Sequence, residues 1–187
     1  MNVLILTPRL NEPGGVANYY KTIKKHFPSS VEYFFVGNDG DKSKLQKLIR
    51  SILDYFMFFK KILLGSYNIV HLNPSLGYKS VIRDAFFLII LKMFKVEVVV
   101  FFRGWNLSIE KIILSNIFYK FLFRKIFLKV KKIIILSSEF ESFFKKLNYK
   151  GSIYLETTVV DDSFVVEELN DDSNRHKNIL FLSRIER

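Results

Sequence analysis

A pair of adjacent glycines follows the first apolar run of the sequence, in a position that could bind an anion. Residues 3–6 predict a buried strand, and Gly14 and Gly15 lie between this strand and a helical pattern that begins at Val16. Glycines at a helix N-terminus let the backbone approach a phosphate, and the free N–H groups there favour negative charge. The alternative is a tight turn that needs glycine for its backbone angles. The spacing G-x-G-x-x-G is absent, so a nicotinamide dinucleotide site is not expected.

A single cation, Arg103, follows the apolar run 96–102 and is followed by Gly104 and Trp105. Arginine keeps its charge at any physiological pH, so Arg103 could contact a phosphate but could not transfer a proton. The alternative interpretation is a surface arginine in a loop at the end of a strand.

The loop after residues 69–72 offers polar groups that could bind a substrate. Ligands of open α/β sheets bind at the carboxyl ends of the strands, which is where Asn73, Ser75 and Tyr78 are expected. An ordinary capping turn would use the same residue types. We also assign Trp105 and Thr157 to this acceptor side, since each follows a predicted strand.

Residues for metal or thiol chemistry are scarce. The chain has no cysteine and three scattered histidines, which excludes a cysteine-based zinc site and argues against a histidine cluster. Asp39-Gly40-Asp41 has the form of a metal-binding pair, but it lies among turn residues and is better explained as a turn that leads into a helix. His71 is interpreted as a core histidine whose ring is satisfied. We expect no metal and no cofactor.

Strand-like and helix-like patterns alternate along the chain, which predicts a Rossmann-like α/β fold with a mostly parallel sheet and helices on both faces. The predicted strands are residues 3–6, 33–36, 69–72, 96–102, 133–136 and 153–155. The predicted helices are residues 16–27, 43–64, 79–94, 109–130 and 138–147.

The composition changes near residue 161. We expect a domain over residues 1–160, then a polar, acidic linker over 161–177. The fresh apolar run 179–182 predicts the first strand of a second domain, over residues 178–187. We therefore expect the chain to hold one domain and only the beginning of another.

These patterns, taken in order, resemble glycosyltransferase family 4, which has the GT-B fold. The resemblance rests on four segments spread over nearly the whole chain: Pro13-Gly14-Gly15-Val16 before a helix, residues 67–73, residues 133–138, and residues 181–186. It departs from the family at Arg103, where many relatives carry a histidine.

The resemblance implies a retaining sugar transferase in which a nucleotide sugar lies between two domains. It assigns Gly14, Gly15 and Arg184 to the donor diphosphate, places Arg103 at the catalytic position, and makes residues 1–160 the acceptor-side domain. The nucleotide pocket would lie in the second domain, so the chain alone is expected to be inactive. Arginine and backbone N–H groups suit this role because a leaving diphosphate needs its charge stabilised.

The net charge of +11 predicts an anionic partner, and it is concentrated on two helical segments. Residues 45–64 and 109–132 interleave lysine and arginine with aromatic residues, as expected for helices that lie on an anionic membrane. The alternative is a pair of core helices with lysine-rich outer faces. No secretory signal or membrane span is predicted, so we expect a cytoplasmic protein, peripheral at the inner face of the cell membrane.

The sequence thus favours the acceptor-side domain of a glycosyltransferase that acts on a glycan or a lipid-linked acceptor. A non-catalytic module that binds a membrane or a partner on the same fold remains the first alternative. A basic nucleic-acid-binding domain is less favoured, because no helix-turn-helix, RNA-binding aromatic motif or zinc finger is present.

Overall fold

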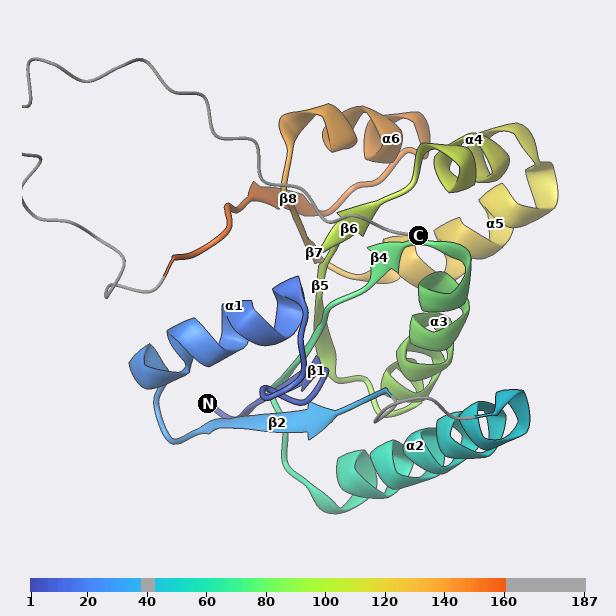
Figure 1. Cartoon of the computed structure of the whole chain (residues 1–187). Coiled ribbons are helices and arrows are strands. Elements are labelled where there is room, and N and C mark those ends of the chain that lie inside the picture. Colours follow the sequence, from blue (N-terminus) through green and yellow to red (C-terminus); the bar gives the residue numbers. More distant parts are fainter. Residues whose placement is uncertain (38–42, 161–187) are drawn as a thin grey trace, which may run out of the picture.

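The apolar runs of the sequence form six parallel strands in one sheet, in the order β2-β1-β3-β5-β7-β8. The computed structural model describes residues 1–37 and 43–160, which Figure 1 shows around this sheet. The strands are β1 (Val3–Thr7), β2 (Val31–Phe35), β3 (Ile69–Leu72), β5 (Glu97–Phe101), β7 (Lys132–Ile135) and β8 (Ser152–Leu155). The predicted α/β, Rossmann-like class is confirmed.

Helices follow the strands on both faces of the sheet. They are α1 (Gly15–Ile23), α2 (Lys44–Leu64), α3 (Tyr78–Met93), α4 (Leu107–Ser115), α5 (Ile117–Ile126) and α6 (Glu141–Lys146), with short 3₁₀ turns at Lys24–His26, Phe127–Lys129 and Ser138–Phe140. In Figure 1, α1 lies on one face, while α2, α3 and α5 lie on the other.

The two faces of the sheet are packed differently. Residues Val70, Leu72 and Val100 are fully buried and belong to the phenylalanine-rich core beneath α2–α6. Their neighbours His71 and Phe101 face α1, where they contact the rings of Tyr20 and Tyr19. Alternation along parallel strands therefore separates a large aliphatic and aromatic core from a smaller aromatic cluster under α1.

One predicted helix is wrong: residues 109–130 form two helices and a 3₁₀ turn. Asn116 leaves the helical conformation, with φ −98° and ψ 118°, and its side chain accepts hydrogen bonds from the backbone N–H groups of Phe118 and Tyr119. This is the N-cap geometry that asparagine favours, and it starts α5 in a new direction. The apolar periodicity continues across the break, which is why periodicity alone did not reveal it.

A two-residue ladder, absent from the prediction, joins the loops after β3 and β5. Strand β4 (Ser75–Leu76) pairs in parallel with β6 (Gly104–Trp105). The backbones approach closely there, because a Cβ atom on Gly104 would lie 3.1 Å from Cβ of Ser75. The ladder fixes the two candidate loops relative to each other.

Candidate functional site

A cleft lies along the carboxyl ends of β1, β3 and β5. Its volume is about 700 Å³, and its walls include the predicted residues Asn73, Ser75, Tyr78 and Arg103. The chain runs from β1 outward to β2 and then back past β1 to β3, so the strand order reverses between β1 and β3. Open α/β sheets bind ligands at such a switch point, which makes this cleft the candidate site.

Arg103 is held over the cleft by its backbone and by two aromatic rings. Its N–H donates to the carbonyl of Pro74 at 2.8 Å, which ties it to the loop after β3. Its guanidinium carbon lies 3.8 Å from the ring centroid of Tyr19 and 4.2 Å from that of Phe101. A planar cation beside two aromatic rings is stabilised by cation–π attraction.

The hydrogen-bonding capacity of Arg103 is not used up within the part of the chain that the structure describes. Its Nη1 is buried and has no hydrogen-bond partner there. Burial lowers the pKa of Arg103, while the nearby Tyr20, Tyr19 and Glu156 oppose this shift. An unpaired buried donor costs free energy, so an anion that accepted from it would be bound favourably.

A buried hydrogen-bond relay connects α1 to β1 across β3. The hydroxyl of Tyr20 donates to Oδ1 of Asn73 at 2.8 Å, and Nδ2 of Asn73 donates to the carbonyl of Leu6 at 2.9 Å. Burial raises the pKa of Tyr20 strongly, so its hydroxyl stays protonated as a donor. Both polar ends of Asn73 are occupied, which makes it a rigid wall of the cleft.

A second relay lies at the start of α3. The N–H of Ser75 donates to Oγ of Ser80, which donates to Oδ2 of Asp84, each at 3.0 Å. Arg83 pairs with the same oxygen of Asp84 at 2.7 Å. Burial raises the pKa of Asp84 even though Arg83 and Ser80 oppose the shift.

Besides Nη1 of Arg103, other buried polar atoms have no hydrogen-bond partner among the described residues. They include Oγ1 of Thr7 and Nε of Arg83, which line the cleft, and Nε2 of His71 on the neighbouring strand β3. Burial, and then the charge of Arg103, lower the pKa of His71 to about 4. His71 is therefore neutral at physiological pH. It packs as a core histidine, as expected, but its ring is not satisfied in the way the sequence suggested.

The glycine pair begins α1 and leaves open space around it. Gly14 has φ 152°, a backbone conformation that favours glycine, while Gly15 is the first residue of the helix. A Cβ atom on either glycine would meet nothing within 4 Å. Val16, the next residue, lines the cleft, so the amide-rich start of α1 lies beside it.

The structure brings together four of the predicted site residues and separates two others from them. Asn73, Ser75, Tyr78 and Arg103 share the cleft, whereas Trp105 and Thr157 are not among its lining residues. The Trp105 ring stacks on Phe140 at 4.1 Å and donates to Glu110 at 2.6 Å, so it anchors the loop instead. Thr157 is exposed after the edge strand β8.

Other predicted features lie outside the described residues. These are Arg184, the linker 161–177, the strand expected within 178–187, and Asp39-Gly40-Asp41.

Sequence reasoning missed residues of two kinds at this site. Thr7, Ser80 and Asp84 line the cleft, and Tyr19, Tyr20 and Glu156 lie near Arg103. Thr7 could have been found, because it ends the first apolar run as Asn73 ends the third. Tyr20 and Asp84 lie within helical patterns, where nothing local distinguishes a residue that faces the cleft from an ordinary one. Glu156 comes near Arg103 only through the fold.

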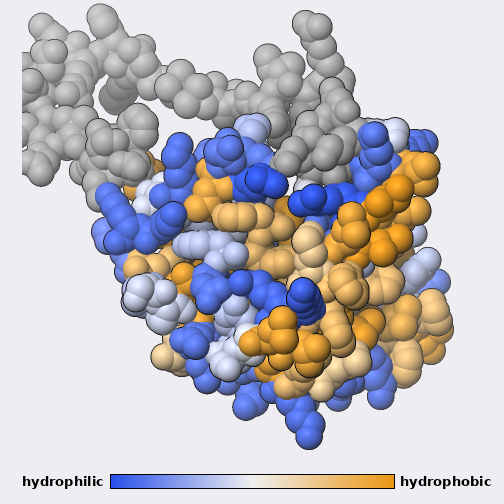
Figure 2. Space-filling view, turned by 90° about the horizontal axis from the view of Figure 1, so that it is seen from below, coloured by the Kyte–Doolittle hydropathy of each residue, from blue (hydrophilic) through white to orange (hydrophobic). Residues whose placement is uncertain are grey.

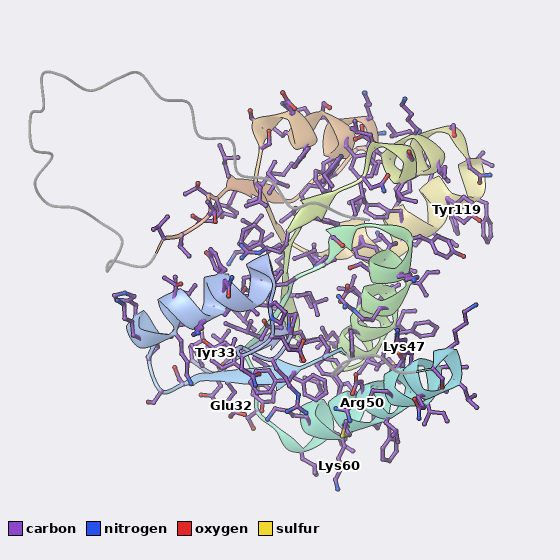
Figure 3. The ribbon with its side chains drawn as sticks, viewed as in Figure 1. Glu32, Tyr33, Lys47, Arg50, Lys60 and Tyr119 are labelled. Carbon is purple, nitrogen blue, oxygen red and sulfur yellow. The ribbon has the colours of Figure 1, made fainter. Side chains whose placement is uncertain are left out.

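A second surface of interest lies over α2, α3 and α5. The apolar stripe of α2 is exposed, while Asp54, Phe58 and Ile62 are its buried residues. Figure 2 shows hydrophobic side chains gathered on the side of the molecule where these helices lie, with hydrophilic ones beside them. Figure 3 shows Lys60 directed away from the sheet on α2, and Tyr119 on α5. The helices are therefore not ordinary core helices with only polar outer faces.

Asp54 is an acidic residue on the buried side of α2. Its carboxylate lies 3.0 Å from Nε of Arg50, one turn earlier, and accepts a hydrogen bond from the backbone of Gly37. Burial raises the pKa of Asp54 despite these partners. The inward Asp54 thus joins α2 to the loop after β2, and the leucine, isoleucine and phenylalanine stripe is left outside.

Neither a metal-binding group nor a membrane-spanning helix is found over residues 1–37 and 43–160. The chain matches no protein-family model and no curated protein.

Proposed function

We propose that the chain is the acceptor-side domain of a retaining glycosyltransferase. It would move a sugar from a nucleoside-diphosphate donor to a glycan or a lipid-linked acceptor, in the cytoplasm and at the inner face of the cell membrane. The single observation that carries this proposal is the Arg103 guanidinium at the switch-point cleft. It contacts Tyr19 and Phe101 and has a buried N–H group without a partner in the part of the chain that the structure describes.

The chemistry of the proposed reaction fits these groups. Breaking the bond between the sugar and a diphosphate leaves negative charge on the diphosphate, and fixed cations and N–H groups stabilise that charge. Arg103 would supply a cation, and the N-terminus of α1 at Gly14 and Gly15 would supply backbone N–H groups. Arg103 does not exchange protons near neutral pH, so its role is electrostatic.

The proposal assigns the donor nucleotide mainly to a second domain, with Arg184 near its start as a further ligand of the same diphosphate. The reaction as proposed needs no metal and no cofactor.

The test compares residues 1–187 with the same chain joined to a donor domain after the proposed linker. We expect residues 1–187 to show no sugar transfer and no micromolar affinity for a nucleotide sugar in calorimetry. The two-domain protein should transfer a labelled sugar to a glycan or membrane-lipid acceptor. Micromolar binding of a nucleotide sugar to residues 1–187 would contradict the domain assignment, and a two-domain protein inactive with a full panel of sugar nucleotides would contradict the activity.

A second candidate is a non-catalytic module that binds a membrane or a partner. The observation that favours it is the exposed apolar stripe of α2, on which Phe56 is 66% exposed. Vesicle binding without any sugar transfer by the two-domain protein would favour this candidate. A nucleic-acid-binding role would require tighter binding to DNA or RNA than to anionic vesicles.

A further inference from the structure

An apolar groove runs between α3, α4 and α5 and has a volume of about 430 Å³. Its walls are aliphatic and aromatic, with Ile82 from α3, Ile112 from α4, and Leu122 from α5 among them. The hydroxyls of Tyr78 and Tyr119 are the polar side-chain groups on this wall. The size lies within the range of small-molecule sites, about 300–1,000 Å³.

The groove is open to solvent along its rim. Ile82 is 44% exposed and Ile112 is 45% exposed, although both are large aliphatic side chains. When a hydrocarbon group replaces water against apolar side chains on an open concave surface, the free energy of the system falls, and this favours binding. The groove therefore suits a flexible hydrocarbon chain.

The groove meets the polar cleft at one residue. Tyr78, the first residue of α3, lines both the groove and the cleft. On the cleft side, the exposed Lys79 follows it directly, and Arg103 lines the same cleft. A ligand that spans this junction would place a tail among apolar side chains and a head beside cations.

We propose that the groove binds the hydrocarbon tail of an anionic amphiphile whose phosphate head lies in the cleft near Lys79. This inference rests on the proposed function and makes its acceptor a lipid-linked one. The charge and polarity of the two compartments carry it: cations line one side of Tyr78, and a nearly all-apolar wall lines the other. A free glycan would use the cleft and leave the groove empty.

The test measures binding of alkyl phosphates to residues 1–187 by calorimetry, below their micelle concentrations. We expect decyl phosphate to bind more tightly than hexyl phosphate, and ethyl phosphate to bind weakly. Each buried methylene group contributes about 0.8 kcal/mol to binding. Every two further methylene groups of the alkyl chain that enter the groove therefore raise the affinity about tenfold.

Variants of α3 then locate the tail. Ile82→Arg puts a charge on the groove wall and should weaken decyl phosphate binding by about tenfold or more, with ethyl phosphate unchanged. Ile89→Arg is the matched control: the same change, two turns along the same helix, at a residue 45% exposed that does not line the groove. Ile112→Arg tests the opposite wall, and thermal unfolding of each variant checks that the fold is intact.

Equal affinity for ethyl and decyl phosphate would overturn the proposal, as would equal decyl phosphate affinity in the wild type and both groove variants. Light scattering measures the oligomeric state of the same variants. A wild-type dimer that Ile82→Arg converts to a monomer would show that a second copy of the chain covers the groove, and this result would also overturn the proposal. No sugar donor is present in these experiments. A failed transfer reaction would therefore contradict the proposed function and leave a positive tail-binding result standing.

Discussion

The guanidinium of Arg103 lies over the ring of Tyr19, with 3.8 Å between its central carbon and the ring centroid. Tyr19 is in the second turn of α1, and Arg103 follows β5, so this contact joins the helix that begins at the glycine pair to the loop that closes the cleft. The contact helps to hold the Arg103 guanidinium at the switch point.

Arg103→Ala should lower the turnover of the two-domain enzyme by about 10²–10³-fold, because one well-placed charge-stabilising group is lost. Arg103→His should recover part of this loss if the position corresponds to the histidine of the resembling family. Arg124→Ala, which removes an exposed arginine on α5, is the control and should keep normal turnover. Steady-state kinetics measure the effect, and unchanged turnover of a folded Arg103→Ala enzyme would place Arg103 outside the reaction.

Gly15→Val should reduce turnover while leaving the domain folded. Gly15 has space for a side chain, so the added carbons do not disturb packing, but they would obstruct backbone approach to the diphosphate. Gly14→Val should in addition lower the melting temperature, because φ of Gly14 is 152°. Thermal unfolding and turnover, measured on both variants, separate the two effects. Normal turnover of Gly15→Val would mean that the glycine pair serves only the turn.

The stability of residues 1–187 should fall as the pH drops from about 6.5 to about 4, with His71 as one cause. The pKa of folded His71 is about 4, against an ordinary value of 6.5. The unfolded chain therefore takes up a proton in this window that the folded chain does not, which favours unfolding by up to about 3 kcal/mol. Asp84, whose pKa is raised by burial, contributes a slope of the opposite sign.

Urea unfolding between pH 7.5 and 4.5 measures this effect as the difference between the wild type and His71→Phe. The phenylalanine ring keeps the contacts with Tyr20 and Phe101 but cannot bind a proton. Identical pH dependence in both proteins would show that His71 takes up its proton in the folded state as well.

Residues 1–187 should bind vesicles that contain anionic lipid, through the exposed apolar and basic surface of α2. The binding should weaken as salt rises, because exposed charges are screened over about 10 Å at 0.1 M ionic strength. Lys60→Glu should lower the vesicle partition coefficient about tenfold, since each basic residue near such a surface contributes about 1 kcal/mol.

Lys24→Glu is the matched control for this experiment, because it makes the same charge change after α1, on the opposite face of the sheet. Co-sedimentation with anionic and neutral vesicles measures both variants. Equal binding to anionic and neutral vesicles, or an equal loss of vesicle binding in the two variants, would contradict the prediction that α2 contacts the membrane.

Much of the fold could be predicted from the sequence, because the signals that determine it are local. The apolar run at β3 predicts a strand and the helical spacing from Ser43 to Leu64 predicts a helix, without any information on what these segments pack against. The alternation of strands and helices, and with it the α/β class, followed from such local patterns. The carboxyl-edge position of Asn73 and Arg103 also followed, since parallel strands end at one edge of a sheet.

The tertiary structure alone decided which side of each element is buried and which is exposed. Helix α2 has a marked apolar stripe, but most of that stripe is exposed. Partners on other elements decided which side is buried: Asp54 accepts a hydrogen bond from the backbone of Gly37, and Phe58 contacts Phe34 and Phe87. The contact of Arg103 with Tyr19 likewise depends on a partner distant in sequence. The break at Asn116 depends on a helix cap that lies within an unbroken apolar pattern. Spacing along the chain determines which residues share a helix face, but packing against distant elements determines whether that face meets the core, a ligand or solvent.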